Sequence, residues 1–178
     1  MSPARAAAAS CFSTPTMGKL SIYTDGASKG NPGPAGIGVV IAADDGTVIR
    51  EIAEYVGEQT NNAAEYLALI RGLREALDLR AKEIEISVDS QLMARQLTGV
   101  YKVKSPNLKS LHEEAIGLLR RLPRARISHV CRGFNKRADE LANEGIERHR
   151  RAESGEPGSP TPKRAAKRKS KAQGELEL

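Results

Sequence analysis

The chain has 178 residues and a mass of 19.2 kDa, which is enough for one domain with extensions but not for two average domains. It contains no Trp, four Tyr and two Phe, so a surface of many aromatic rings stacked on bases is not expected. The longest apolar run, 36–43, is far shorter than the roughly 20 residues of a membrane-spanning helix. We therefore expect no membrane segment.

The formal net charge of +6 is unevenly distributed. Residues 19–94 hold seven basic and 12 acidic residues, whereas 95–149 hold 12 basic and six acidic ones. An acidic half beside a basic half fits a site that collects metal ions next to a surface that meets a polyanion. Charges scattered over a solvated surface are the alternative.

Two cysteines, Cys11 and Cys131, are too few for a disulfide framework, and no CxxC motif indicates a zinc site. Free thiols are typical of proteins in a reducing compartment. We expect a cytoplasmic protein that acts as a monomer.

The two ends differ in composition from the middle. Residues 1–18 are rich in Ala, Ser, Thr and Pro without an apolar signal region, and are predicted to be a disordered extension. Residues 150–178 hold eight Lys/Arg against four Asp/Glu among Pro, Gly and Ser, a composition that buries too little apolar surface to fold. This basic tail is expected to be disordered and could contact nucleic-acid phosphates nonspecifically. The folded domain is then 19–149.

The middle alternates between strand and helix patterns. Short links, including a tight turn at Asp45-Gly46, join the first three strands into an antiparallel meander. Helices separate the later strands, which should therefore run parallel to the first. The sequence predicts an α/β fold with a five-stranded mixed sheet and helices on both faces. The expected strands are 19–24, 36–42, 47–56, 83–88 and 124–130, with a Gly/Pro loop over 26–35. The expected helices are 63–77, a short one after Ser90, one starting near Ser105, and 135–148.

Four acidic residues stand at unusual places. Asp25 follows the apolar part of the first strand, and Asp89 follows the fourth. If these strands are parallel neighbours, both carboxylates lie at the sheet edge where open α/β sheets hold ligands. Glu65 and Asp139 each lie in the first turn of a predicted helix.

Each acid also has a structural explanation. Glu65 fits a capping box with Asn62, Asp139 favours a helix dipole, and Asp25 and Asp89 could simply end their strands. Gathered without cations, however, the four would repel one another and raise each other's pKa. Hard divalent cations such as Mg²⁺ or Mn²⁺ remove this conflict. Two of them form a clamp for phosphodiester cleavage, so no protein nucleophile is needed.

The motifs resemble those of the ribonuclease H family, in its small type 1 class and short bacterial and archaeal form. The matching stretches follow the family order: YTDGA at 23–27, GNPGPAG at 30–36, TNNAAEY at 60–66, VDSQL at 88–92, YKVKSPNL at 101–108 and FNKRADELAN at 134–143.

The resemblance implies a ribonuclease H-like sheet of order 3-2-1-4-5 and hydrolysis of the RNA strand of RNA/DNA hybrids, leaving 5′-phosphate and 3′-hydroxyl ends. It implies two ions per site, Mg²⁺ or alternatively Mn²⁺. Asp25 would bridge both ions and Asp139 would hold the ion that activates water. Glu65 and Asp89 would hold the ion on the leaving-group side.

The resemblance also implies substrate contacts. The amides would read the minor groove, where the 2′-hydroxyl distinguishes RNA from DNA. Thr60 would contact a DNA phosphate, and Arg132 would make an auxiliary phosphate contact. For the amides, turn and cap chemistry is the alternative, and for Arg132, a solvated loop position. The family's usual Arg after the two Asn is Ala63 here, and its basic handle is absent. The amide candidates are Asn31, Asn61, Asn62 and Gln91.

Two other functions stay open at this stage. A nuclease of the same superfamily could act on double-stranded RNA or transfer strands. A binding module could keep the fold without catalysis, but it would have no need to collect negative charge where phosphates arrive.

Overall fold

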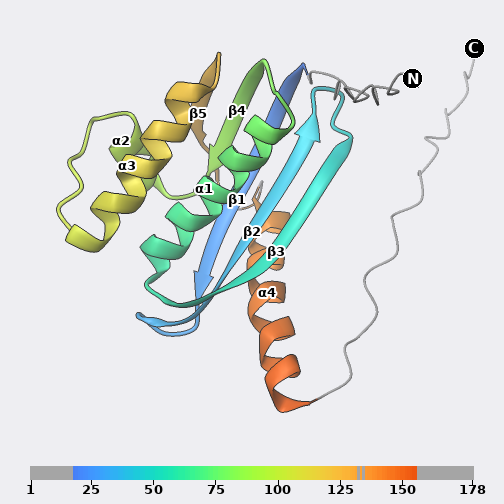
Figure 1. Cartoon of the computed structure of the whole chain (residues 1–178), viewed down its shortest axis with the longest axis vertical. Helices are drawn as coiled ribbons and strands as arrows, with labels where there is room; N and C mark the ends of the chain where they lie inside the picture. Colours follow the sequence, from blue (N-terminus) through green and yellow to red (C-terminus); the bar gives the residue numbers. More distant parts are fainter. Residues whose placement is uncertain (1–17, 132, 134, 156–178) are drawn as a thin grey trace, which may run out of the picture.

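The computed structural model describes residues 18–131, 133 and 135–155. Its five strands form one sheet in the order β3-β2-β1-β4-β5, as predicted (Figure 1). β1 pairs antiparallel with β2 and parallel with β4, and β5 is parallel to β4. The strands are β1 (Lys19–Ser28), β2 (Gly33–Ala43), β3 (Val48–Gln59), β4 (Glu83–Val88) and β5 (Ala125–His129).

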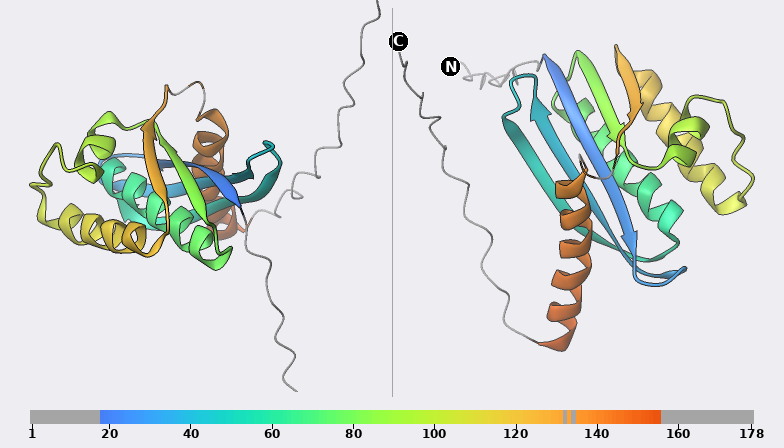
Figure 2. Two further views of the ribbon diagram at one scale, coloured as in Figure 1. Left: turned by 90° about the horizontal axis from the view of Figure 1, so that it is seen from above. Right: turned by 180° about the vertical axis from the view of Figure 1, so that it is seen from behind.

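Helices cover both faces of the sheet, as expected (Figure 2). The main core lies between the sheet and the helices of one face, around Leu20, Leu69 and Ile86. A smaller core around Val40 and Leu141 joins the opposite face to α4. No helix in the described ranges has the length and apolar character needed to cross a membrane. The helices are α1 (Asn61–Asp78), α2 (Gln91–Leu97), α3 (Pro106–Arg121) and α4 (Lys136–Ser154).

The largest departures from the predicted boundaries are at the Gly/Pro loop and at the end of the last helix. The Gly/Pro loop predicted over 26–35 is much shorter, because β1 continues to Ser28 and pairs there with Ala35 of β2. Asp25 therefore lies inside a strand and does not end it.

The last helix runs to Ser154, five residues into the segment predicted to be disordered, and ends at Gly155 with a left-handed φ of 71°. Contacts from other elements support this end of α4, including Tyr55 of β3 stacked on His149 with ring centroids 3.7 Å apart. The remaining tail, 156–178, and the extension, 1–17, lie outside the described residues.

Two glycines allow helix backbones to approach the sheet beside Asp25. A Cβ on Gly26 would lie 2.2 Å from the backbone of Ala64 in α1. A Cβ on Gly38, the β2 partner of Asp25, would lie 1.9 Å from the carbonyl oxygen of Ala138 in α4. Because these positions lack a side chain, the first turns of both helices reach the strand that carries Asp25.

We expect Gly38→Ala to lower the free energy of unfolding by several kcal/mol, since the added methyl group must push α4 off the sheet. The control is Gly117→Ala in α3, where a Cβ meets nothing within 4 Å. That change should raise stability by about 0.5–1 kcal/mol, because Ala favours a helix over Gly. Urea unfolding of both variants measures the difference. Equal effects would contradict the close α4–β2 contact.

Candidate active site

Asp25 and Asp89 lie side by side at one edge of the sheet. The parallel β1–β4 register ends with Thr24 opposite Val88, so each aspartate is the next residue after that pair. This is the neighbouring arrangement that the sequence predicted. Asp25 is 7% exposed and Asp89 half-buried.

Glu65 reaches the same edge from the first turns of α1. The N-cap of this helix is Thr60, whose hydroxyl accepts a hydrogen bond from the backbone N–H of Ala63 at 3.3 Å. Asn62 lies inside the helix, so an Asn62–Glu65 capping box is not how the helix begins. Instead, Nδ2 of Asn61 donates to Oε1 of Glu65 at 3.0 Å and orients this carboxylate.

Asp139 is brought to the site by a contact of Asn135, a residue to which the sequence patterns gave no role. Asn135, at the N-cap of α4, is 2% exposed and donates from Nδ2 to the backbone oxygen of Thr24 at 2.9 Å. Its side chain thus ties the start of α4 to the residue before Asp25. The side-chain oxygens of Asn135 and Thr24 are buried without a hydrogen-bond partner among the described residues, which costs stability. The signal in the sequence was a polar residue four positions before Asp139.

The four carboxylates interact through Asp25. Burial, followed by the charges of Asp89, Asp139 and Glu65 and a hydrogen bond with Asp139, raises the pKa of Asp25 to about 8. Removal from water and like charges both favour the neutral form of an acid. The fold therefore brings the other three predicted acids, from α1, from α4 and from the residue after β4, near the buried Asp25 of β1.

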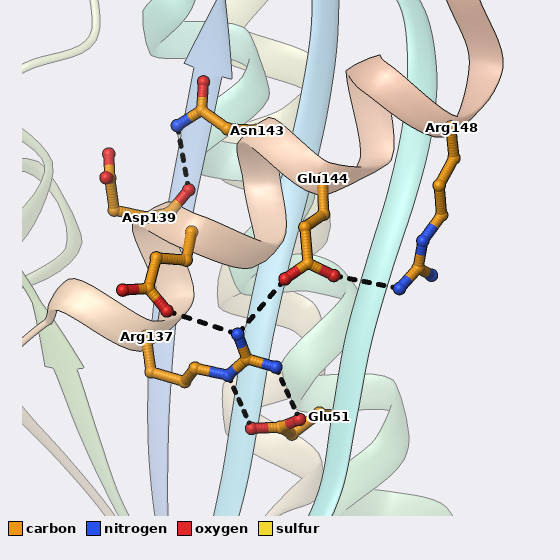
Figure 3. Close-up of polar contacts among 7 residues, drawn as sticks. Glu51, Arg137, Asp139, Asn143, Glu144 and Arg148 are labelled. Atoms are coloured by element: carbon orange, nitrogen blue, oxygen red, sulfur yellow. Dashed lines mark hydrogen bonds and ion pairs between the residues drawn. The ribbon is translucent and has the colours of Figure 1, made fainter. Parts of the chain in front are cut away.

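Arg137, a basic residue in the first turn of α4, is engaged elsewhere and does not neutralise this cluster. Arg137 makes a bidentate pair with Glu51 of β3 at 2.8 and 2.9 Å and also contacts Glu140 and Glu144 at 3.2 Å. Figure 3 shows the carboxylate of Asp139 directed away from this network. Arg137 therefore fixes α4 on β3. The carboxylate of Asp139 interacts with Asp25 instead.

The predicted substrate residues fall into three groups. The first group lies at the start of α1. Asn31 contacts it there, because its Oδ1 accepts a hydrogen bond from the backbone N–H of Asn61 at 3.3 Å, and Thr60 and Asn62 are the neighbours of Asn61 in the chain. Gln91 is the exposed first residue of α2, directly after Asp89 and the N-cap Ser90. Arg132 lies outside the described residues. The two described groups therefore lie next to Glu65 and Asp89 respectively, and their substrate roles stay predictions.

The donor set fits a hard divalent cation by its chemistry, because it consists of carboxylate oxygens whose mutual repulsion a cation relieves. As the side chains stand, no group of three acidic, His or Cys residues in the described ranges is arranged to hold an ion. The other three acids still raise the pKa of Asp25, because Coulomb repulsion acts over longer distances than metal ligation.

Comparison with known proteins shows the family to which this chain belongs. The profile of the family described as "Reverse transcriptase-like" matches residues 23–145, which include all four carboxylates. Among curated relatives, the "Ribonuclease H" of Dinoroseobacter shibae is 38% identical over 147 residues, covering 73% of this chain and 92% of the relative. The chain belongs to the ribonuclease H family, in its short bacterial and archaeal type.

Further relatives agree with this assignment. "Ribonuclease HI" of Halobacterium salinarum is 44% identical over 130 residues, covering 73% of this chain and 65% of that protein. The chain thus spans just under two thirds of this relative. The crystal structure of LC11-RNase H1, isolated from compost, was determined in complex with an RNA/DNA hybrid. It matches with a TM-score of 0.69 at 45% identity, covering 73% of this chain and 98% of that one.

Proposed function

We propose that the protein is an endonuclease that hydrolyses the RNA strand of RNA/DNA hybrids, leaving 5′-phosphate and 3′-hydroxyl ends. The observation that carries this proposal is the buried Asp25 with three further carboxylates, Asp89, Asp139 and Glu65, acting on it. The hybrid bound by LC11-RNase H1, at 45% identity, supports the choice of substrate. A binding module would gain nothing from a buried acid surrounded by like charges.

Asp25, Glu65, Asp89 and Asp139 would hold two Mg²⁺ or Mn²⁺ ions in this function. When bound, such a pair supplies an activated water and stabilises the departing oxygen. Asp25, the most buried of these four acids and the one whose pKa the other three raise, would be the ligand that both ions share. Asp139 would help to hold the ion that activates water. Glu65 and Asp89 would hold the ion on the leaving-group side. Asn61 keeps Glu65 oriented through its 3.0 Å hydrogen bond.

The amides beside the carboxylates would identify the RNA strand. Asn31, Asn61 and Asn62 gather at the start of α1, and Gln91 lies at the start of α2. An amide both donates to and accepts from a 2′-hydroxyl without adding charge, which suits minor-groove recognition of RNA. Thr60 and Arg132 would contact phosphates.

Matched duplexes test the substrate and the need for metal. With Mg²⁺, we expect cleavage of an RNA/DNA hybrid into products with 5′-phosphates, and little cleavage of double-stranded RNA or DNA of the same sequence. Mn²⁺ should also support the reaction, and a chelator should abolish it. Cleavage of the hybrid that persists in the chelator would contradict the role of the carboxylates, and equal cleavage of double-stranded RNA would contradict the substrate.

The basic tail completes the proposal. Its Lys and Arg side chains would contact phosphates nonspecifically, each contact adding roughly 0.7–0.9 to the slope of affinity against salt. Deleting 156–178, which leaves α4 whole, is expected to lower hybrid affinity at low salt and to leave the maximal cleavage rate unchanged. Filter binding over a salt series measures this. An unchanged salt slope would show that the tail makes no such contacts.

We also propose that the enzyme acts as a monomer, because one chain supplies all four carboxylates. Light scattering at the concentration of the cleavage assay tests this, and a dimeric mass would contradict it.

A further inference from the structure

A cavity of about 660 Å³ lies away from the carboxylates, between α3 and the segment that follows α2. One wall is a single face of α3, because its residues recur at helical spacing from Lys109 through His112 and Ile116 to Arg120. The other wall is the segment 99–103. The volume falls within the range of roughly 300–1,000 Å³ that is usual for small-molecule sites.

The base of this cavity is fixed by hydrogen bonds. Gln96 is 7% exposed, and its Oε1 accepts from the hydroxyl of Tyr66 at 2.9 Å. The ring nitrogen Nε2 of His112 lies 3.2 Å from the backbone oxygen of Gln96. These contacts join α1, α2 and α3, so the cavity is built on a preformed floor.

Three cations line the cavity: Lys102, Lys109 and Arg120. Their side chains form no ion pair or hydrogen bond with any described residue. One carboxylate, Glu113, faces them in the lining. This leaves an excess of positive charge that the described part of the protein does not compensate.

Some surface cations outside the cavity are paired with acids, whereas others, such as Lys104 and Arg121, form no ion pair with a described residue. Arg74 of α1 pairs at 2.6 Å with Glu114, which lies on α3, the helix that forms the cavity wall. Arg148 pairs with Glu144 at 2.9 Å. What distinguishes the cavity is that three uncompensated cations line one concave site, and this clustering favours an anionic ligand there.

An aromatic and apolar part accompanies the charge. Tyr101 is 44% exposed, and Arg95 holds it in place by donating to its hydroxyl and lying 5.2 Å from its ring centroid. Val103 and Ile116 add apolar surface to the lining. Lys and Arg pair strongly with phosphate, and an aromatic ring stacks on a base. A ligand that fits both the cations and the aromatic part of the lining therefore carries a planar ring system together with a phosphate.

We propose that this cavity is a second binding site, specific for a nucleotide phosphate. The ligand is either a free nucleotide or the phosphorylated terminal nucleotide of a strand, and both present the same base and phosphate. The site goes beyond the proposed hydrolysis of hybrids and needs neither the carboxylates nor a metal.

The test uses the full chain in a chelating buffer, where no cleavage takes place. Adenosine 5′-monophosphate, adenosine and inorganic phosphate are titrated separately, with calorimetry for affinity and amide NMR shifts for location. We expect the monophosphate to bind at least about tenfold more tightly than either adenosine or phosphate, with shifts over 96–120. Phosphate that binds as tightly as the nucleotide would overturn the proposal, as would shifts confined to other elements.

Matched double variants separate the site from general charge. Lys109→Ala with Arg120→Ala is expected to weaken nucleotide binding at least about tenfold. Lys104→Ala with Arg121→Ala removes the same charge from exposed residues that do not line the cavity, and should change affinity less than about twofold. An equal loss in both would overturn the proposal.

A 5′-phosphorylated DNA tetranucleotide identifies the source of the ligand. Binding tighter than that of the mononucleotide, and sensitive to the cavity variants, supports a strand end, and weaker binding supports a free nucleotide. Because binding is measured without metal, its absence would leave the hybrid-cleavage proposal untouched. Loss of hybrid cleavage would likewise leave the cavity proposal standing.

Discussion

Asp89→Asn is expected to fold normally and to cleave RNA/DNA hybrids roughly two to four orders of magnitude more slowly in Mg²⁺. The amide has nearly the same shape as the carboxylate, and the backbone oxygen of Asp89, 3.1 Å from Nε2 of His129, is unchanged. A neutral amide, however, is a far weaker ligand for a hard cation at the proposed leaving-group side. Single-turnover cleavage and thermal unfolding are the two measurements.

The control for this variant is Glu83→Gln at the opposite end of β4. It removes the same charge from the other end of the strand that Asp89 follows, and its cleavage rate should stay within about twofold of the unmodified chain, as for other surface changes. Equal rates for Asp89→Asn and the unmodified chain would remove the proposed metal role of Asp89. Loss of folding by Asp89→Asn would instead show a structural role.

Asp25→Asn is expected to be more stable than the unmodified chain at pH 8 in a chelating buffer, by about 2 kcal/mol or more. The folded-state pKa of Asp25, about 8, lies above its ordinary value of 3.8. Folding therefore takes up a proton between these values. The stability that the neutral acid contributes is present below pH 4 and is lost as the pH rises toward 8. Asn stays neutral throughout, so the difference between the two proteins should grow over this interval.

Urea unfolding from pH 4 to pH 8 tests this prediction. Asp78→Asn, at the exposed end of α1, removes the same charge away from the cluster and should change stability little. Mg²⁺ should restore stability to the unmodified chain more than to Asp25→Asn, because an ion that binds only the folded state stabilises it. Parallel stability profiles for Asp25→Asn and the unmodified chain would contradict the crowded, buried environment of Asp25.

The strand directions were predictable from local patterns, whereas the sheet order, and with it the placing of Asp25 beside Asp89, was implied by the family resemblance. Alternating apolar residues mark β4. Strands joined by short links are antiparallel, and strands joined through a helix are parallel. Once β1 and β4 are parallel neighbours, the residues after their last apolar positions must meet at one edge.

Other features were not predictable because distant segments decide them. β1 continues through Asp25 because β2 pairs with it as far as Ser28 and Ala35. The end of α4 gains a stacking partner, Tyr55, that is nearly a hundred residues away from His149. The N-cap of α1 is Thr60, although Asn62 had the better local pattern.

The amino-acid sequence alone determined the order of the elements and the identity of the four acids, because periodicity and turn residues act over a few positions. The tertiary structure decided how those acids behave. Gly26 and Gly38 let two helices close on β1, and Asn135 ties the second of them to Thr24. The resulting burial and the proximity of three carboxylates set the pKa of Asp25, since desolvation and Coulomb repulsion depend on distances in space.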